Sequence, residues 1–392
     1  MNVTFLAEKL DRTGGSSFSL NLLASRLCDR GHSITILTTN LFQENDVPET
    51  HQYKIVDNVI ESSSRYAGFL KIPSVLRQYE STTDIYHIFN PQHLAVAGLY
   101  RKSGNTPTVG RLNAYDAFCT NPGVMNGTCY KNCSLTDKIR HDDRKKKKKL
   151  IRSPQYVFQH LSPRLINYLD CIFAQSPAIK NVYSYNGIAE DSIDIVTNFY
   201  DPNFTQQSST EENMPSNNIV ILYVGRLRPE KGVDLLIDAA KELDMSNISI
   251  NIIGGGPMRE ELEAQATNAG LSKSIRFHGW VDHSNLPRYY KKSDIFVHPG
   301  KWPEPSGRTI LEALQYDCPV VVSDIGGPPW IAGDAGKTFE PNDASDLSQT
   351  INELQNPETL LEYTVKCEEV IQRFKPKNII SDIERKYTSL LK

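Results

Sequence analysis

The stretch that decides the fold covers residues 219–243 and reads IVILYVGRLRPEKGVDLLIDAAKEL. Its first six residues form a continuous apolar run, which is typical of a strand buried on both faces of a parallel sheet. A loop with two glycines follows, and residues 233–243 then carry apolar side chains at helical spacing. A buried strand that leads through a short loop into an amphipathic helix is the repeating unit of an α/β fold.

The same unit recurs on both sides of this stretch. A helix is expected at residues 18–28, between the two strands nearest the N-terminus. The other strands are predicted at residues 3–7, 33–38, 248–253, 295–298 and 319–323. This alternation predicts an α/β protein built from doubly wound parallel sheets.

The chain of 392 residues is long enough for two domains, each with its own core. The polar, aperiodic stretch 206–218 reads as a linker. We therefore predict a Rossmann-like N-terminal domain over residues 1–205 and a Rossmann-like C-terminal domain over residues 206–376. A last helix, over residues 377–392, is expected to pack back on the first domain.

Composition and charge argue against several classes of protein. With 39% apolar and 23% charged residues, the chain has the composition of an ordinary globular protein, and its net charge of −3 argues against nucleic-acid binding. The sequence contains no run of about 18 apolar residues, the length that a membrane-spanning helix needs. The N-terminus reads as a strand rather than a signal peptide. The seven cysteines are expected to be reduced, which predicts a cytoplasmic protein.

Three of the cysteines, Cys119, Cys129 and Cys133, cluster near His141. They could hold a zinc ion with His141 as the fourth ligand, or form a disulfide. A loop of small, partly buried residues would explain the same cluster, and the sequence leaves these alternatives open.

The feature most suggestive of chemistry covers residues 298–312 and reads HPGKWPEPSGRTILE. It follows a predicted strand and opens a helix, for which Ser306 is a candidate N-cap. Backbone N–H groups at such a helix start attract phosphate, and the carboxylates of Glu304 and Glu312 can accept hydrogen bonds from sugar hydroxyls. Two solvated glutamates without a ligand would be the alternative interpretation.

The loop after the strand at residues 219–224 carries Arg226 and Lys231. A planar guanidinium and a compact ammonium are the usual pair for a diphosphate, and open α/β sheets bind ligands at the carboxyl ends of their strands. Ordinary surface charges would be the alternative, but both this loop and the glutamate segment follow strands of one predicted sheet.

Gly14 and Gly15 follow the first strand, where a glycine lets the backbone approach a ligand. The motif is not the dinucleotide fingerprint Gly-x-Gly-x-x-Gly, and no acidic residue follows at the distance an NAD ribose needs. An NAD-dependent dehydrogenase is therefore disfavoured, and a plain tight turn is the alternative interpretation.

Taken in order, these segments resemble the family-4 retaining glycosyltransferases, and the resemblance covers nearly the whole chain. The matching segments are Gly14-Gly15, residues 198–201, Gly225-Arg226 with Lys231-Gly232, residues 254–257, 277–281, Glu304 to Glu312, and 319–327. Two glutamates with seven residues between them are the most specific of these motifs. The resemblance implies the GT-B fold, in which two Rossmann-like domains enclose a cleft.

The resemblance also implies a role for each residue. Arg226 and Lys231 would bind the donor diphosphate and stabilise the leaving group, in place of a metal. Glu304 would hold a hydroxyl of the donor sugar, and Glu312 would bind the nucleotide ribose. Further donor contacts would come from Gly14, Gly15, Gly254, Gly255, Gly256, Pro257, Val281, Pro305, Ser306, Gly307, Arg308 and Thr309. No metal and no cofactor is expected, because the nucleotide sugar is a co-substrate.

The first domain departs from the family pattern. Asn113 stands where many members of the family carry a histidine that contacts the donor sugar, and Asp116 or Arg111 could substitute for it. Arg111, Asn113 and Tyr115 are candidates for the acceptor side. His87 matches another family position near the cleft, but a core histidine in a strand would fit equally well.

A basic run precedes a helix-like stretch in the first domain. Residues 138–152 contain nine basic and two acidic residues, a net charge of +7. Such a run suggests contact with an anionic membrane surface, where a polyprenyl-linked acceptor would lie. The central residues of the run are Lys145, Lys146, Lys147, Lys148 and Lys149. Ser162 and Pro163 read as the start of a helix whose apolar face packs inward.

These observations predict a retaining glycosyltransferase that takes a sugar from a nucleotide diphosphate sugar. Its acceptor would be a lipid-linked saccharide or another glycan precursor, and the enzyme would be cytoplasmic or peripheral on the cytosolic face of the membrane. Two other functions remain open on the same fold: a sugar-nucleotide epimerase or phosphorylase, and a non-catalytic protein that binds sugar nucleotides. No nucleic-acid partner is expected.

Overall fold

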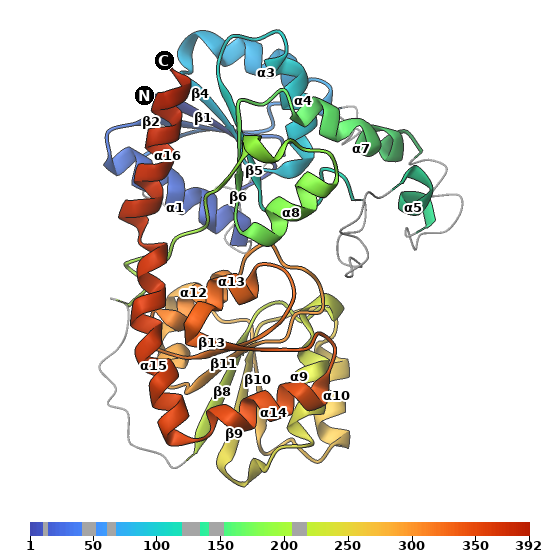
Figure 1. Ribbon diagram of the computed structural model, residues 1–392, viewed down its shortest axis with the longest axis vertical. Coiled ribbons are helices and arrows are strands. Elements are labelled where there is room, and N and C mark those ends of the chain that lie inside the picture. Colours follow the sequence, from blue (N-terminus) through green and yellow to red (C-terminus); the bar gives the residue numbers. More distant parts are fainter. Residues whose placement is uncertain (11–14, 41–51, 61–67, 120–133, 141–152, 206–217) are drawn as a thin grey trace. The chain divides into compact units, whose positions relative to one another are not determined.

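The computed structural model describes residues 1–10, 15–40, 52–60, 68–119, 134–140, 153–205 and 218–392. The chain divides into two compact units, one formed by residues 1–198 and 377–392 and the other by residues 199–376. Each unit contains one parallel sheet with helices against it (Figure 1). Among the described residues, no helix is both long and apolar enough to cross a membrane.

The first unit has a seven-stranded sheet in the order β3-β2-β1-β4-β5-β6-β7. Its strands are β1 Asn2–Ala7, β2 Ser33–Thr38, β3 Lys54–Val56, β4 Ile85–Ile88, β5 Thr108–Leu112, β6 Cys171–Ala174 and β7 Ile193–Ile195. Its helices are α1 Gly15–Asp29, α3 Ile72–Tyr79, α4 Pro91–Arg101, α5 Leu135–Arg140, α7 Ser153–Ile166, α8 Pro177–Tyr185 and α16 Pro376–Leu390.

The second unit has a six-stranded sheet in the order β10-β9-β8-β11-β12-β13. Its strands are β8 Ile219–Val224, β9 Ile248–Ile253, β10 Ile275–Gly279, β11 Ile295–His298, β12 Val320–Ser323 and β13 Gly336–Phe339. Its helices are α9 Val233–Ala240, α10 Arg259–Asn268, α11 Pro287–Lys291, α12 Arg308–Leu314, α13 Pro328–Ala332, α14 Ala344–Leu354 and α15 Pro357–Ile371. Apolar clusters fill both faces of the sheet, under α9 and α14 on one face and under α12 and α15 on the other.

These two sheets confirm the predicted fold class, and their strand orders place two topological switch points. From β8 the chain moves outward through β9 and β10, then returns to β11 on the other side of β8. In the first unit, β1 and β4 have the same relationship. At such a point the loops leave adjacent strands in opposite directions, and ligands of open α/β sheets bind there.

Helix α16 contributes to the first unit although it comes last in the chain (Figure 1). Its Tyr387 is buried, with the phenolic oxygen 2.5 Å from Nδ1 of His87 in β4. Glu384 accepts a hydrogen bond of 2.8 Å from Arg30, just beyond α1, and lies 2.9 Å from His32. These contacts fasten the C-terminal helix to the N-terminal sheet.

Two helix starts differ from the prediction. Helix α7 begins at Ser153 rather than at Ser162, and Pro163 lies inside it, where Ser162 donates a hydrogen bond of 2.9 Å to the carbonyl of Phe158. The predicted N-cap Ser306 is also wrong, because α12 starts one residue later, with Gly307 as its N-cap and no side-chain capping bond. Glycine is tolerated there at small cost because the first N–H groups of the helix remain open to other partners.

Candidate functional site

The glycine loops after β8 and β9 lie backbone against backbone. The N–H of Leu227 donates to the carbonyl of Gly255 at 2.9 Å. A Cβ added at Gly254, which has a φ of +138°, would lie 1.8 Å from the carbonyl oxygen of Gly225. This close approach requires glycine, because a side chain would collide with the backbone and force an unfavourable φ. The loops therefore form one rigid edge at the carboxyl ends of the two strands.

The loop after β11 closes on the same edge. Gly232, which precedes α9, has a φ of +69°, and a Cβ there would lie 1.8 Å from the carbonyl oxygen of Pro299. The N–H of Lys301 donates to the carbonyl of Glu230 at 2.9 Å. The segments on the two sides of the switch point are thus held together by their main chains.

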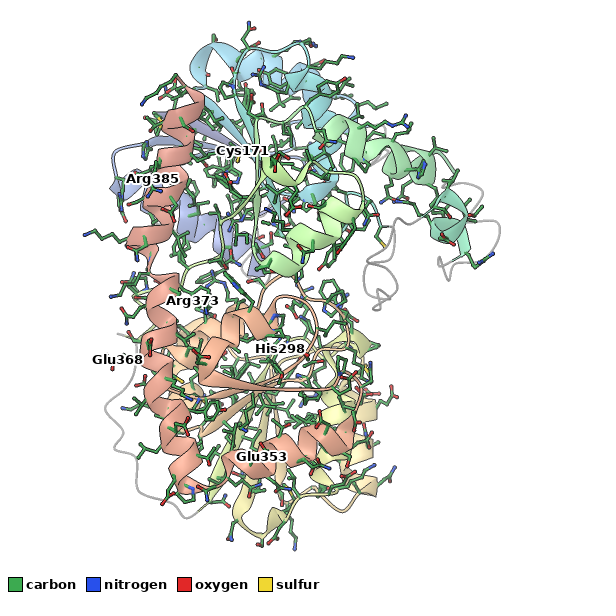
Figure 2. The ribbon with its side chains drawn as sticks, viewed as in Figure 1. Cys171, His298, Glu353, Glu368, Arg373 and Arg385 are labelled. Atoms are coloured by element: carbon green, nitrogen blue, oxygen red, sulfur yellow. The ribbon has the colours of Figure 1, made fainter. Side chains whose placement is uncertain are left out.

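Lys231 and Glu304 form an ion pair across this switch point. Nζ of Lys231 lies 2.7 Å from Oε2 of Glu304, and each side chain is 20% exposed. Nε2 of His298, the last residue of β11 (labelled in Figure 2), lies 3.1 Å from the same carboxylate oxygen. The indole ring of Trp302 lies 5.9 Å from the Lys231 ammonium, a cation–π contact. The carboxylate and the ammonium that the sequence singled out are therefore neighbours.

The electrostatics keep Glu304 ionised. Burial by itself would raise the pKa of the Glu304 carboxyl, but Lys231 and His298 lower that pKa from its usual 4.5 to about 2 through charge and hydrogen bonding. A carboxylate in this state is a pure hydrogen-bond acceptor, suited to hydroxyl donors. The ammonium of Lys231 has three donor hydrogens, of which one is directed at Glu304.

Arg226 differs from Lys231 in its exposure. It is exposed at the start of the loop, and its guanidinium makes no hydrogen bond or ion pair with any described residue. Its carbonyl instead accepts a bond of 3.0 Å from the hydroxyl of the buried Tyr223. The main chain of Arg226 is therefore anchored, while its side chain carries an exposed positive charge in the same loop as Lys231.

Glu312 is buried on α12, on the second turn of the helix. Its two carboxylate oxygens accept from Tyr290, at 2.9 Å, and from Nε2 of His283, at 3.0 Å. Arg308, in the first turn of the same helix, is half-buried; burial lowers the pKa of its guanidinium, and the negative charges of Glu312 and Asp201 partly offset that shift. An acidic side chain with this degree of burial requires such partners, because an isolated buried carboxylate is very costly.

The other predicted donor contacts of the second unit lie on loops at the same edge of the sheet. The residues Gly254, Gly255, Gly256 and Pro257 follow β9, Val281 follows β10, and Pro305, Ser306, Gly307, Arg308 and Thr309 lie between β11 and the first turn of α12. Apart from Gly255 and its two chain neighbours, no described residue has an atom within 4 Å of a Cβ placed on Gly255. This edge of the sheet therefore brings together most of the residues singled out from the sequence.

In the first unit, the described part of the predicted site is polar but small. Gly15 opens α1, and Gly14 lies outside the described residues. The amide of Asn113, after β5, donates to the carbonyl of Phe89 at 2.9 Å and to the hydroxyl of Ser16 at 3.1 Å. Asn113 thus links the loops after β4 and β5 to the start of α1, at the switch point of the first sheet.

Three other predicted residues lie in the core instead: His87, Arg111 and Tyr115. His87 is fully buried beneath Tyr387 and stacks on Phe5 at 4.9 Å between ring centroids; burial, with Arg111, lowers its pKa well below the usual range. Arg111 is buried over the ring of Phe89, and its pKa falls to about 10 because of burial. The structure thus makes His87 a core histidine of a strand rather than a group that faces a ligand, and Arg111 is equally enclosed.

Tyr115 is likewise buried, against Phe118 and Tyr183. Asp116 is partly exposed, and its carbonyl accepts from Gln159 of α7 at 3.0 Å. Of the first-domain candidates, Asn113 and Asp116 therefore remain accessible.

Three residues of the site were missed from the sequence: His298, His283 and Tyr290. His298 is the first residue of the glutamate segment, residues 298–312. Its position at the end of a predicted strand was the signal that could have identified it. His283 and Tyr290 carried no signal, because their contacts with Glu312 depend on how α11 and α12 pack.

Several predicted residues lie outside the described part of the chain. They are Lys145, Lys146, Lys147, Lys148 and Lys149 of the basic run, together with Cys129, Cys133 and His141. Cys119 is partly exposed. Within the described ranges, no group of three or more His, Cys, Asp or Glu side chains is arranged to hold a metal ion.

Two family models match the chain. The model described as "Glycosyltransferase Family 4" matches residues 13–204, and the model described as "Glycosyl transferases group 1" matches residues 204–369. Their common border lies within a few residues of the division between the two compact units.

Similar curated proteins match over part of their length. The O-antigen chain mannosyltransferase C of Escherichia coli is 29% identical over 227 residues, which are 56% of this chain and 58% of that protein. An uncharacterised glycosyltransferase of Methanocaldococcus jannaschii is 35% identical over 159 residues, 40% of each chain. The chain thus spans about half the length of the curated relatives that it matches.

Solved structures match over the whole chain. HepE of Anabaena, in complex with UDP, superposes with a TM-score of 0.74 at 20% sequence identity, covering 99% of this chain and 100% of that one. At this identity the similarity establishes the fold, two parallel α/β domains of the GT-B type.

Proposed function

The chain belongs to the family-4 glycosyltransferases (glycosyl transferases group 1), and from this premise we propose that it transfers a sugar from a nucleotide diphosphate sugar to an acceptor, with retention of configuration. The observation that carries the proposal is the Lys231–Glu304 ion pair at the switch point of the second sheet, with the exposed Arg226 in the same loop as Lys231.

The two cations would bind the diphosphate. Lys231 has donor hydrogens left after its bond to Glu304, and the guanidinium of Arg226 offers a planar fork of donors. Both would stabilise the negative charge that develops on the departing diphosphate, which is the main electrostatic requirement of the reaction. Their loop is fixed by backbone contacts, so little reorganisation would accompany binding.

The two glutamates would orient the donor. Glu304, kept ionised by Lys231 and His298, would accept a hydrogen bond from a hydroxyl of the donor sugar, and Glu312 would accept from the nucleotide ribose. The loop at Gly254, Gly255, Gly256 and Pro257, together with Val281, would line the site of the base. Backbone at Ser306, Gly307 and Arg308 would contact sugar and phosphate.

In the reaction, the bond between the anomeric carbon and the donor phosphate oxygen breaks, and a bond to the acceptor oxygen forms on the same face of the sugar. The leaving phosphate oxygen takes the proton of the acceptor hydroxyl, and a nucleoside diphosphate is released. Arg226 and Lys231 neutralise the charge on the leaving group, so no metal ion is needed for that purpose.

The acceptor side would lie in the first domain, with Asn113 and Asp116 as the accessible candidates. We propose a lipid-linked saccharide as acceptor and a peripheral position on the cytosolic face of a membrane. The described helices α5 and α7 flank the lysine run in the sequence, and exposed apolar side chains lie on them or just beyond them: Ile139 on α5, Val157 and Leu161 on α7, and Tyr168 two residues after α7. Contrary to the sequence-based expectation, part of the apolar stripe is therefore exposed rather than packed inward. An exposed apolar stripe beside a basic run suits an anionic lipid surface.

The experiment that tests the function is a donor screen followed by a turnover assay. Sugar nucleotides of each base are first ranked by the rise in melting temperature that they cause, because a ligand of the folded state stabilises it by mass action. UDP-glucose is a suitable first donor, since HepE has been solved in complex with it. Release of nucleoside diphosphate that requires acceptor supports a transferase; product without acceptor supports an epimerase, and tight binding with no turnover supports a non-catalytic protein.

A further inference from the structure

The carboxylate of Glu312 is held from two sides by side chains of one preceding segment. The hydroxyl of Tyr290 donates to Oε2 at 2.9 Å, and Nε2 of His283 lies 3.0 Å from Oε1. The Glu312 side chain is only 5% exposed, whereas the His283 side chain is 33% exposed. Because a carboxylate can only accept, Nε2 of His283 carries the proton of this bond.

His283 is itself placed by packing. Its ring lies against Phe204, with centroids 4.7 Å apart and an angle of 31° between the planes. Phe204 is fully buried and meets Tyr290 and Tyr316 edge to face, at 5.8 Å and 5.7 Å. The hydroxyl of Tyr316 donates to the carbonyl of Phe204 at 3.0 Å. The imidazole therefore has a fixed stacking partner independent of its bond to Glu312.

The Glu312 carboxylate keeps unused hydrogen-bond acceptor positions in this arrangement. An ionised carboxylate can accept about four hydrogen bonds. Tyr290 and His283 take one on each oxygen of Glu312. One acceptor position remains on each oxygen. These two positions match the two vicinal hydroxyls of a ribose in number. A rotation of the carboxylate would break this match.

We propose that His283 is a positioning residue, which holds the Glu312 carboxylate so that its two remaining acceptor positions face both hydroxyls of the nucleotide ribose. This inference rests on the proposed function, in which Glu312 binds the ribose. His283 acts through Glu312 and makes no contact with the donor. Its contribution is therefore seen only with nucleotides that carry the ribose hydroxyls.

The test compares UDP with 2′,3′-dideoxy-UDP, and GDP with its dideoxy counterpart, by titration calorimetry on the full chain. In His283→Phe the ring can stay against Phe204 but no longer donates; in His283→Gln a side-chain amide can again donate to Glu312. The matched control is His32→Phe, because His32 lies 2.9 Å from Glu384 in a similar pair in the first unit.

We expect the wild type to prefer the ribonucleotide and His283→Phe to lose most of that preference, roughly tenfold in affinity. Affinity for the dideoxy analogue should not change, His283→Gln should recover the preference, and His32→Phe should retain it. If His283→Phe lost affinity equally for the ribonucleotide and its dideoxy analogue, or kept the full preference for the ribonucleotide, only the role of His283 would be overturned. A wild type that binds both nucleotides equally, or neither, would overturn the assignment of Glu312 as well.

Discussion

Nζ of Lys231 and Oε2 of Glu304 lie 2.7 Å apart although 73 residues separate them in the chain. The pair joins the loop after β8 to the loop after β11, the two central strands of the second sheet. Each group compensates the other, so neither charge is left uncompensated in a partly buried position before a ligand arrives. The pair therefore serves the stability of the unliganded protein and the charge distribution of the proposed donor site.

The depressed pKa of Glu304 predicts a pH dependence of stability. The pKa is about 2 in the folded protein against an ordinary 4.5, so the folded state binds the proton less tightly than the unfolded state does. The resulting stability, at most about 3 kcal/mol, is present above pH 4.5 and is lost as the pH falls towards 2. Urea unfolding measures the free energy of unfolding of wild type and Glu304→Gln at each pH. The difference between the two free energies should become smaller as the pH falls from 4.5 towards 2.

The matched variant for this series is Glu353→Gln, which removes the partner of Lys337. Glu353 is 62% exposed, so its pair is expected to contribute little and its removal should leave the pH profile unchanged. If the free energies of unfolding of wild type and Glu304→Gln differed by the same amount from pH 5 to pH 3, the assigned pKa of Glu304 would be contradicted.

The glycine loop predicts a contrast between neighbouring positions. Gly254→Ala should reduce the free energy of unfolding by about 1–3 kcal/mol, because its Cβ would lie 1.8 Å from the carbonyl oxygen of Gly225 at a φ of +138°. The Cβ of Gly255→Ala would meet no atom of a non-adjacent described residue within 4 Å, so this variant should change the free energy of unfolding by less than about 0.5 kcal/mol. Denaturant unfolding of the two variants measures both values, and equal losses would show that the close approach is absent.

The buried contact between His87 and Tyr387 predicts an effect on stability without an effect on catalysis. Tyr387→Phe leaves Nδ1 of His87 without its partner in the core and should cost about 1–3 kcal/mol. Turnover per folded molecule should stay at the wild-type level. A fall in turnover with unchanged stability would instead return His87 to the reaction.

Membrane contact predicts binding to vesicles that contain anionic lipid. Replacing Lys145 to Lys149 with serine should abolish most of the binding, since each basic residue near such a surface contributes about 1 kcal/mol. Val157→Ser with Leu161→Ser should weaken binding further, because both side chains are exposed on α7, at 47% and 40%. Co-sedimentation with neutral and anionic vesicles measures both effects, and binding that is independent of lipid charge would rule out the lysine run as an anchor.

The strands and the donor loops could be predicted because their signals are local. An apolar run such as residues 219–224 can only be a buried strand in this context, and the carboxyl ends of parallel strands must meet at one edge of the sheet. The same two rules place Lys231 and Glu304 at one edge of the sheet. The family resemblance supplied their roles, which geometry alone does not give.

Side-chain environments depended on packing that the sequence does not encode locally. His87 and Arg111 lie in strands, where alternate residues face opposite sides of the sheet, and only the position of α16 decides that their side is covered. Helix α7 starts earlier than its Ser-Pro pair suggested; it packs so closely on α4 that a Cβ at Gly98 would lie 1.9 Å from the carbonyl oxygen of Leu165. That tertiary contact outweighs the local signal of Pro163.

We propose that the Lys231–Glu304 edge of the second sheet activates a nucleotide diphosphate sugar. The most direct measurement is the single-turnover rate of nucleoside diphosphate release, with donor and acceptor saturating, in wild type and in Lys231→Met. Lys337→Met is the control, since Lys337 forms a 2.6 Å ion pair elsewhere in the same unit. We predict a fall of about 100- to 1,000-fold for Lys231→Met, as for the loss of one charge-stabilising donor, and the wild-type rate for Lys337→Met. A folded Lys231→Met that turns over at the wild-type rate would contradict the claim.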